Sequence, residues 1–335
     1  MSRVAVMGSG AWGTAIAISL ARRGGHQVAL WSYAKDVAQT MRQKRENTAF
    51  LGGFELPESI AVTDEAGEAL ADAEIVVSVT PSEFTRASFE QFGPHLRDGQ
   101  MLVSATKGIE DETYLRMTQV IGEVLSTRGL RLSCGVLSGP SFAQEVAAGA
   151  PTAVTIASSD AELAARVQRE FSSRSLRLYT NDDVVGVELG GSIKNVIAIA
   201  AGIVAGLGLG FNSNAALITR GIAEMTRLAM ACGGRRETLA GLSGMGDLVL
   251  TCTGSLSRNR TVGMELGRGR TLEEILAGLK GKVAEGVRTT SAALGLARRH
   301  GVEMPIAEQM EAILMHGKSP ERAIEELMVR PGRDE

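Results

Sequence analysis

Aromatic residues are scarce in this chain. Phe, Trp and Tyr together make up 4% of its 335 residues, too few for the stacking surfaces with which proteins bind single-stranded nucleic acid. The formal net charge of −3 also gives no basic field that would attract a nucleic-acid backbone. We therefore expect a small-molecule ligand and no nucleic-acid partner.

Cysteine is rare too, and the three that are present lack the spacing of metal ligands: Cys134, Cys232 and Cys252. This pattern predicts a reducing, cytoplasmic environment and no metal site. We expect no signal peptide, because Val4–Met7 already has the character of a strand and Gly8 follows directly. The longest run with almost no charge, residues 195–223, contains several glycines. It favours a buried helix ending in a loop and no membrane insertion.

Short apolar runs alternate with helical segments over the first 180 residues or so. We predict strands at Val4–Met7, Val28–Trp31, Ile75–Val79, Leu102–Ala105, Cys134–Leu137 and Ala153–Ile156, with Leu176–Tyr179 as an edge strand. We predict helices at Thr14–Arg23, Asp36–Lys44, Glu83–Phe92, Thr113–Ser126 and Ala161–Phe171. Runs that are apolar on both faces are typical of a parallel sheet with helices on both sides.

After Asn181 only helical periodicity is strong. The predicted helices are Val184–Val204, Ala215–Ala231, Thr271–Leu279, Thr289–Arg299, Ile306–Met315 and Glu321–Met328. The predicted fold class is therefore α/β: a Rossmann-type doubly wound sheet in residues 1–181, followed by a second, all-helical domain in residues 182–330. Apolar helix faces in the second domain fit a homodimer interface and a monomer core equally well.

A glycine-rich turn joins the first predicted strand to the first predicted helix. Gly8, Gly10 and Gly13 form the pattern G-x-G-x-x-G in this strand–turn–helix context. Gly8 permits the tight turn, Gly10 lets the backbone approach a pyrophosphate, and Gly13 lets the helix pack close to the strand. Unpaired N–H groups at the helix N-terminus attract the anion. The turn predicts a bound dinucleotide; the alternative is a glycine turn without a ligand.

The residues after the second predicted strand should discriminate NADH from NADPH. An acidic residue there would bind the ribose of NADH, but the chain has Ser32, Tyr33 and Lys35, with no carboxylate before Asp36. Two hydroxyl groups and an amine suit a 2′-phosphate, so the sequence favours NADPH, or the use of both NADPH and NADH. The alternative is that Lys35 is a solvated residue at a helix start.

Lys194 is the one charged residue between Leu189 and Phe211. A charge in such an apolar helix needs a partner, and the amide of the adjacent Asn195 is also costly to bury. Gly190 and Gly191, one turn earlier, should leave the space above this helix face open for a ligand. We expect Lys194 to meet a carbonyl or a phosphate; a lysine that extends from a buried helix into solvent is the alternative.

Two further polar clusters follow in the second half. Asp247 lies in an apolar, glycine-rich segment and needs a cationic partner, for which Lys194 is the best candidate. Ser257, Arg258 and Asn259 form a compact donor set suited to a phosphate, because the guanidinium is a planar fork. A solvated polar loop is the alternative for this set.

Two segments at strand ends belong to the same group. Lys107 follows the fourth strand, and open parallel sheets bind ligands at the carboxyl ends of their strands; a surface lysine is the alternative. The segment Ser138–Ala143 follows the next strand and can offer backbone donors to cofactor or substrate. Taken alone, this segment predicts only a turn.

Histidine is absent from all of these segments, since the chain has only His26, His95, His300 and His316. The histidine–carboxylate pair of many hydroxy-acid dehydrogenases is therefore not expected. Zinc-protease, α/β-hydrolase and Walker motifs are missing as well. A proton needed in the reaction must come from a lysine.

Taken together, these segments resemble the bacterial-type NAD(P)-dependent sn-glycerol-3-phosphate dehydrogenases over essentially the whole chain. The matching segments occur in order and at compatible spacing: Gly8–Ala15, Asn47–Pro57, Ala105–Ile109, Ser138–Ala143, Glu188–Ile197, Gly241–Thr253, Ser257–Arg260 and Val283–Thr289. Members of the family often have a basic residue or histidine where this chain has Ser32 and Tyr33.

The resemblance implies an NAD(P)H-dependent oxidoreductase that interconverts dihydroxyacetone phosphate and sn-glycerol 3-phosphate for phospholipid synthesis. The catalytic residues would be Lys194, Lys107 and Asp247. The substrate would be bound by Lys107, Gly139, Ser141, Asn195, Asp247, Thr251, Ser257, Arg258 and Asn259. With the glycine turn and the segment after the second strand, the cofactor set would be Gly8, Gly10, Ala11, Trp12, Gly13, Ser32, Tyr33, Lys107, Ala143, Arg258, Val283 and Glu285.

Two other functions stay open. A reductase like 6-phosphogluconate or β-hydroxyacid dehydrogenase also joins a Rossmann domain to a helical domain with a catalytic lysine, but the cluster at residues 257–259 favours a phosphorylated ketone. A non-catalytic nucleotide sensor would need the glycine turn but not Lys107, Lys194 and Asp247.

Overall fold

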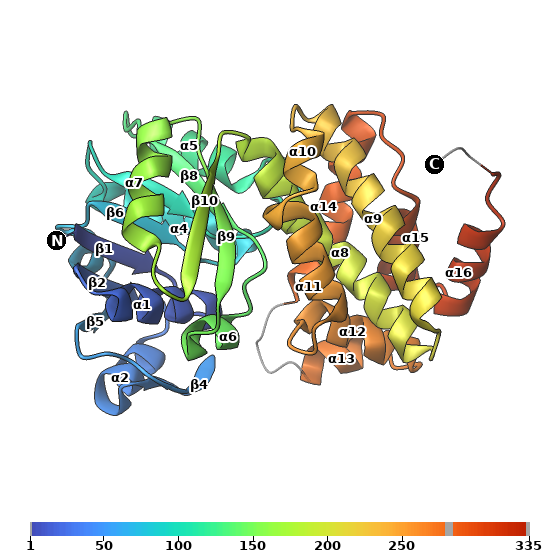
Figure 1. Cartoon of the computed structure of the whole chain (residues 1–335), viewed down its shortest axis with the longest axis horizontal. Coiled ribbons are helices and arrows are strands. Elements are labelled where there is room, and N and C mark those ends of the chain that lie inside the picture. The colour runs from blue at the N-terminus through green and yellow to red at the C-terminus, as the bar shows by residue number, and fades with distance from the viewer. Residues whose placement is uncertain (1, 279–283, 333–335) are drawn as a thin grey trace. The chain divides into compact units, whose positions relative to one another are not determined.

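The computed structural model describes residues 2–278 and 284–332. The chain divides into two compact units, which are described one at a time (Figure 1). The first unit contains Met1–Lys107 and Leu115–Glu188; the second contains Gly108–Tyr114 and Leu189–Glu335.

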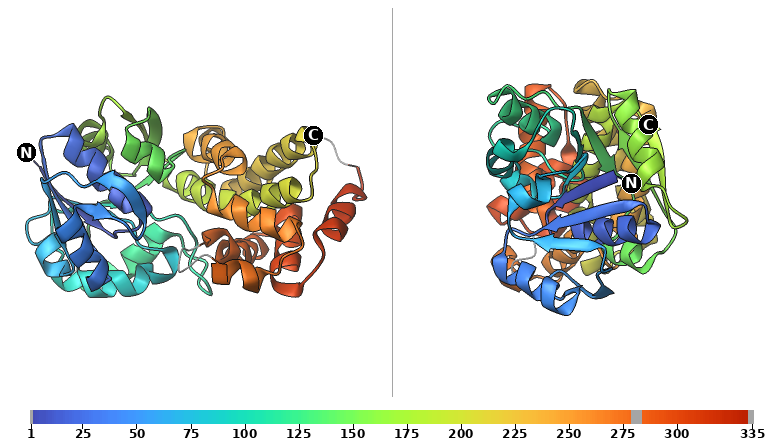
Figure 2. Two further views of the ribbon diagram at one scale, coloured as in Figure 1. Left: turned by 90° about the horizontal axis from the view of Figure 1, so that it is seen from below. Right: turned by 90° about the vertical axis from the view of Figure 1, so that its left-hand side faces the viewer.

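The first unit is built on one large sheet with helices on both faces (Figure 2). Its strands are β1 (Ser2–Met7), β2 (His26–Trp31), β5 (Ile60–Thr63), β6 (Ile75–Ser78), β7 (Met101–Ser104), β8 (Cys134–Ser138), β9 (Thr152–Ala157) and β10 (Leu176–Asn181), and β3 (Glu46–Asn47) pairs with β4 (Leu51–Glu55) in a separate hairpin. Its helices are α1 (Ala11–Arg23), α2 (Lys35–Lys44), α3 (Ala66–Leu70), α4 (Thr85–Phe92), α5 (Met117–Ser126), α6 (Ala143–Ala148) and α7 (Ala161–Phe171).

The strand order, β10-β9-β8-β7-β6-β1-β2-β5, places β1 where the chain reverses its direction of travel across the sheet. The six neighbouring strands β8, β7, β6, β1, β2 and β5 run parallel, whereas β9 is antiparallel to β8. The prediction of a wholly parallel sheet is therefore wrong for β9 and β10. Between β8 and β9 the chain forms only α6, whose six residues rise about 9 Å. A helix so short does not carry the chain back along β8 for a parallel return.

Alternate residues of the central strands enter two different cores. Val4 and Val6 pack with α1, α6 and α7, and Ala5 and Met7 pack with α3, α4 and α5. Side chains of a strand point to opposite faces in turn, so an uninterrupted apolar run is what a sheet covered on both sides requires. The predicted Rossmann-type arrangement of the first half is confirmed, although β5 and the β3–β4 hairpin were not predicted.

In the described part of the second unit, residues 108–114, 189–278 and 284–332, the regular elements are helices. They are α8 (Val184–Gly206), α9 (Phe211–Ala231), α10 (Arg236–Leu239), α11 (Asp247–Thr253), α12 (Arg258–Gly267), α13 (Leu272–Gly278), α14 (Glu285–Arg299), α15 (Pro305–His316) and α16 (Pro320–Met328), with a π-helical segment at Leu242–Gly246. The predicted helical second half is confirmed; Leu279, the last residue of one predicted helix, lies outside the described residues.

Helix α8 is long and apolar enough to cross a membrane, but 89% of its most apolar window is buried inside the protein. Its first turns pack on the first unit, because Val184 and Val187 contact Val136 and Ala157. The unit break falls after Glu188, seven residues later than the change of sequence character at residue 181.

One buried carboxylate organises the far part of the second unit. Glu224 on α9 is 3% exposed and accepts hydrogen bonds from the backbone N–H groups of Ile306, at 2.8 Å, and Ala307, at 3.4 Å. It thus caps the N-terminus of α15, where N–H groups lack helical partners. Burial raises the pKa of this carboxyl from an ordinary 4.5 to about 7, against the opposing effect of the two N–H groups.

Candidate active site

The glycine turn of the first unit has the geometry of an anion-binding loop. Gly8 has φ +134°, and a Cβ there would lie 2.7 Å from the Val79 carbonyl oxygen. A Cβ on Gly13 would lie 1.9 Å from the Gly8 carbonyl oxygen, whereas one on Gly10 would meet nothing within 4 Å. The turn is therefore closed by Gly8 and Gly13 and open at Gly10, beside the first N–H groups of α1.

A buried polar network that we did not predict fixes this turn. Asn47 donates from Nδ2 to the Ser9 carbonyl oxygen, at 2.7 Å, and to Thr14 Oγ1, at 2.8 Å. Ser9 Oγ donates to Ser32 Oγ at 2.7 Å. The sequence analysis named Asn47 only as the start of one segment of the family resemblance and assigned it no role.

Ser32 is placed differently from the prediction. Its side chain is fully buried, and its hydroxyl donates to the Ala34 carbonyl oxygen at 3.1 Å. The hydroxyl proton is thus committed inside the protein, so Ser32 holds the loop in shape instead of offering its hydroxyl to a ligand. Tyr33 is 81% exposed, and Lys35 is exposed with Glu65 4.0 Å away; of the three residues, these two are the ones that a ligand can reach.

Other polar atoms collect near the carboxyl ends of the central strands. The hydroxyls of Ser78 and Ser104, which end the paired strands β6 and β7, are buried without a hydrogen-bond partner, as are Thr80 Oγ1 and Trp12 Nε1. Buried polar groups seldom lack partners except at sites that bind something. With the open Gly10, this donor set fits a dinucleotide.

Lys107 lies at the same end of the sheet, beyond β7. Its Nζ donates to the Gly139 carbonyl oxygen at 3.4 Å, and Ser141 Oγ donates to the same oxygen at 2.9 Å. Ala143 is the first residue of α6, directly after this turn. The structure therefore brings Lys107, Gly139 and Ser141 together within the first unit.

In the second unit, Lys194 has the partner that its burial requires. Its Nζ donates to Asp247 Oδ1 and to Thr251 Oγ1, both at 2.7 Å, and the side chains of Lys194 and Asp247 are 7% and 2% exposed. Thr251 Oγ1 also donates to the Asp247 carbonyl oxygen at 2.6 Å, one turn back on α11. The predicted ion pair is present, and Thr251 fixes its geometry.

The space above Gly190 is not open, contrary to our expectation. A Cβ on Gly190 would lie 2.6 Å from the Ser243 carbonyl oxygen and 3.4 Å from Gly244 Cα. The backbone of the π-helical segment fills this space, so Gly190 serves helix packing. The contact draws the segment that precedes Asp247 onto the helix that carries Lys194.

Glycines also bring α12 into backbone contact with α8. A Cβ on Gly202 would lie 2.1 Å from the Arg260 carbonyl oxygen, and one on Gly263 would lie 1.9 Å from the Ile199 carbonyl oxygen. Any side chain at either position would force the two helices apart. The N-terminus of α12, with the predicted phosphate-binding residues, is therefore held against the helix that carries Lys194 and the buried Asn195.

The N-terminal turn of α12 combines three donors in one place. Ser257 is the N-cap, and its Oγ accepts from the Arg260 backbone N–H at 3.2 Å. Arg258 is exposed, and Asn259 Oδ1 accepts from the Gly286 N–H at 3.0 Å, which leaves the NH2 end of this amide as the donor. Glu285, next to Gly286, begins α14; Val283 lies outside the described residues.

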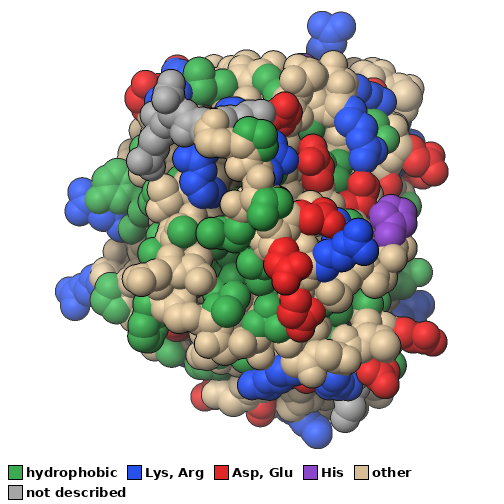
Figure 3. Space-filling view, turned by 90° about the vertical axis from the view of Figure 1, so that its right-hand side faces the viewer, with side chains coloured by type: hydrophobic (Ala, Val, Ile, Leu, Met, Phe, Trp, Pro, Cys, Tyr) green, Lys and Arg blue, Asp and Glu red, His purple; other side chains and the backbone are tan. Residues whose placement is uncertain are grey.

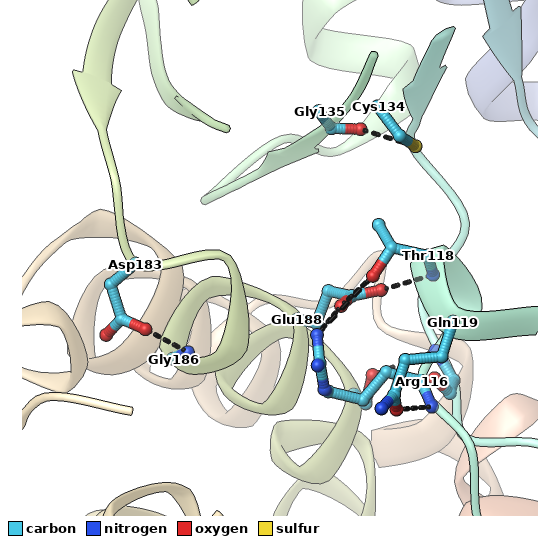
Figure 4. Close-up of polar contacts among 10 residues, drawn as sticks. Arg116, Thr118, Gln119, Cys134, Gly135, Asp183, Gly186 and Glu188 are labelled. Atoms are coloured by element: carbon cyan, nitrogen blue, oxygen red, sulfur yellow. Dashed lines mark hydrogen bonds and ion pairs between the residues drawn. The ribbon is translucent and has the colours of Figure 1, made fainter. Parts of the chain in front are cut away.

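Glu188 anchors the beginning of α8 within the first unit (Figure 4). It is buried, pairs with Arg116, and accepts from the backbone N–H and the hydroxyl of Thr118, at 2.9 Å and 2.7 Å. Burial, together with this carboxylate, raises the pKa of the nearby Cys134 thiol to about 12. Cys134 therefore stays protonated and is no nucleophile.

Cys252, beside the Lys194 cluster, is equally inert. Burial raises the pKa of its thiol to about 12, although Lys194 and Arg260 act in the opposite direction. Among the described residues, no group of three His, Cys, Asp or Glu side chains could hold a metal ion.

Comparison with known proteins gives one consistent result. Residues 3–164 match the N-terminal part, and residues 183–325 the C-terminal part, of the NAD-dependent glycerol-3-phosphate dehydrogenase family. The chain is 65% identical to the glycerol-3-phosphate dehydrogenase (NAD(P)+) of Acidobacterium capsulatum over the whole length of both, and 62% identical to that of Koribacter versatilis over 100% of this chain and 99% of the relative. A crystal structure of glycerol-3-phosphate dehydrogenase from Coxiella burnetii superposes with a TM-score of 0.93 at 38% identity, covering 98% of this chain and 99% of that one.

Proposed function

Because the chain belongs to the NAD-dependent glycerol-3-phosphate dehydrogenase family, we propose that it reduces dihydroxyacetone phosphate to sn-glycerol 3-phosphate with NAD(P)H, for phospholipid synthesis. It is an NAD(P)-dependent oxidoreductase. The observation that carries the proposal is the buried amine of Lys194, held at 2.7 Å by both Asp247 and Thr251.

The residues of the second unit do the acid–base work and the phosphate binding. Lys194 donates a proton from Nζ to the oxygen of the reacting ketone, and Asp247 and Thr251 hold this amine in position. Arg258 and Asn259 bind the phosphate, assisted by the N-terminus of α12. Binding the phosphate away from the reacting carbon orients the ketone.

The residues of the first unit bind the dinucleotide. The open position at Gly10 and the N-terminus of α1 accept the pyrophosphate, and Tyr33 and Lys35 face the ribose end, where they favour NADPH. Lys107 contacts the substrate and adds positive charge near the developing alkoxide. The nicotinamide, when bound, supplies the hydride.

The direct test is oxidation of NADPH in the presence of dihydroxyacetone phosphate, followed by absorbance, with unphosphorylated dihydroxyacetone as the control. Activity with 6-phosphogluconate or a β-hydroxyacid, but not with dihydroxyacetone phosphate, would favour the alternative reductase. Catalytic efficiencies with NADPH and NADH decide the cofactor preference, and a strong preference for NADH would contradict the assignment of Tyr33 and Lys35.

We further propose a cytoplasmic homodimer with no nucleic-acid partner and no membrane insertion. Figure 3 shows hydrophobic side chains gathered on one face of the second unit, with acidic and basic side chains beside them. Exposed apolar residues of this unit include Phe211, at 93%, and Met328, at 79%. Sedimentation equilibrium measures the oligomeric state; a monomer at micromolar concentration would contradict the dimer.

A further inference from the structure

The segment Gly108–Tyr114 belongs to the second unit, although the residues on both sides of it belong to the first. We call this segment the strap. Lys107 directly precedes it, and a trans peptide bond holds the Lys107 Cα about 3.8 Å from that of Gly108. Whatever fixes the strap therefore also fixes the backbone of Lys107.

The beginning of the strap is tied to the helix that carries Lys194. The Gly108 N–H donates to Ser192 Oγ at 2.9 Å, and Ser192 Oγ donates to the Gly108 carbonyl oxygen at 3.1 Å. Ser192 is two residues before Lys194. Ile109, the residue after Gly108, is buried, with 4% of its surface exposed. One hydroxyl thus binds both polar groups of the residue that follows Lys107.

The end of the strap has an unfavourable backbone conformation that other contacts must stabilise. Glu112 has φ +66° and Tyr114 φ +59°, and residues other than glycine adopt this region only at a cost. The Tyr114 ring packs against Gly295, where a Cβ would lie 2.2 Å from the ring. The Arg299 guanidinium lies 4.4 Å from the ring centroid, and its Nη1 donates to the Thr113 carbonyl oxygen at 2.7 Å.

We propose that Ser192 and the Tyr114–Arg299 pair are positioning residues for Lys107. They hold the strap on α8 and α14, and because Lys107 is covalently joined to the first residue of the strap, they limit how far its backbone can move. This inference rests on the proposed function, in which Lys107 contacts the substrate. Strain in the strap is retained because a relaxed strap would let Lys107 move.

The main test measures whether the anchors act through Lys107. Ser192→Ala and Arg299→Gln are each made alone and in combination with Lys107→Ala. Each should lower kcat/KM for dihydroxyacetone phosphate by about tenfold, as the loss of one or two hydrogen bonds predicts. In the Lys107→Ala background each should cause no further loss, because the group that they position is gone.

Matched variants separate positioning from general weakening of the fold. Arg298→Gln removes a guanidinium from the neighbouring position on α14, where it pairs with Glu311 at 2.9 Å, and should leave kcat/KM unchanged. Tyr114→Phe keeps the ring and should behave as the unaltered protein. Gly295→Ala pushes a methyl group into the ring and should reproduce the loss seen in Arg299→Gln.

A second readout needs no catalysis. Acetylation of the Lys107 amine in the ligand-free protein, measured by peptide mass spectrometry, should be faster in Arg299→Gln than in Arg298→Gln. Equal labelling rates, or losses of kcat/KM that add to that of Lys107→Ala, would overturn the positioning role. An unaltered protein that fails to reduce dihydroxyacetone phosphate would instead refute the proposed function, while the labelling comparison would still decide the role of the strap.

Discussion

The carboxyl ends of the central strands and the Lys194 cluster are both polar, but their hydrogen bonding differs. At the strand ends, Ser78 and Ser104 have buried hydroxyls without partners. In the second unit, Lys194 and Asp247 form a short ion pair that Thr251 completes. The difference indicates a division of work: at the strand ends, hydroxyl groups are left to bind a ligand, whereas the Lys194 amine is held in position before any ligand binds.

The largest loss of activity should come from removing the Lys194 amine. Lys194→Ala should lower kcat by roughly two to four decades, as expected for loss of a general acid, while NADPH still binds. Stopped assays measure kcat, and quenching of tryptophan fluorescence measures cofactor binding. Lys318→Ala, which removes another paired lysine of the second unit, is the control. Near-normal turnover of Lys194→Ala would remove it from the proton-donating role.

The buried carboxyl of Glu224 offers a second comparison with the paired Lys194, because burial makes its ionisation unfavourable. Its pKa is raised to about 7, so between pH 4.5 and 7 the unfolded chain releases a proton that the folded protein keeps. Stability should therefore fall as pH rises through this window and then level off. Glu224→Gln should abolish this loss, which amounts to at most about 3 kcal/mol.

Urea unfolding at pH 4 and pH 8 measures the difference for Glu224→Gln. Glu321→Gln, an exposed acid in the first turn of α16, is the control and should leave the pH dependence in place. If Glu224→Gln and the unaltered protein lose stability in parallel, the buried carboxyl is ionised in the folded protein throughout this range.

Arg258 differs from both regions of the comparison, because its side chain is exposed and we propose that it binds the substrate phosphate. Arg258→Ala should raise the KM for dihydroxyacetone phosphate about ten- to a hundredfold, the value of a charged hydrogen bond. It should leave the weak reaction with unphosphorylated dihydroxyacetone unchanged. Arg268→Ala, at the other end of α12, is the matched control. An equal effect on both substrates would argue against phosphate recognition.

The smallest change in stability should come from a substitution at the carboxyl ends of the central strands. Ser104→Ala removes a buried hydroxyl that lacks a partner, so the ligand-free protein should gain about 1 kcal/mol of stability. Ser158→Ala removes a buried hydroxyl that donates to the Cys134 carbonyl oxygen at 3.0 Å and should lose a similar amount. Thermal unfolding compares the two variants. A loss in both would mean that Ser104 has a partner in solution and that the two regions are less different.

Much of the first unit could be predicted because its signals are local. The run Val4–Met7 and the glycines after it lie within a dozen residues, so the strand and the turn can be recognised without knowing how distant segments pack. The antiparallel β9 could not be predicted, because its direction depends on how far α6 carries the chain. The burial of Ser32 likewise depends on Ser9, which is distant in sequence.

The site of the second unit was predictable for a different reason. A lone lysine and a lone aspartate in apolar segments each need a partner, and this argument paired Lys194 with Asp247 without any knowledge of the helix packing. Gly190 was misjudged, because a glycine on a helix leaves the same gap whether a ligand or another backbone fills it. Helices α11 and α12 were missed because Ser, Thr and Gly weaken their apolar periodicity.

The contact of Gly202 with α12 and of Gly263 with α8 has a consequence for substrate size. Main-chain contacts alone hold the N-terminal turn of α12, which we propose binds the phosphate, against the helix that carries the Lys194 amine. Substitutions elsewhere in the core can change how firmly the protein holds together without changing the length of molecule that it accepts. If Lys194 and the N-terminal turn of α12 hold the two ends of the substrate as proposed, accepting a longer phosphate ester would require a change at these two glycines.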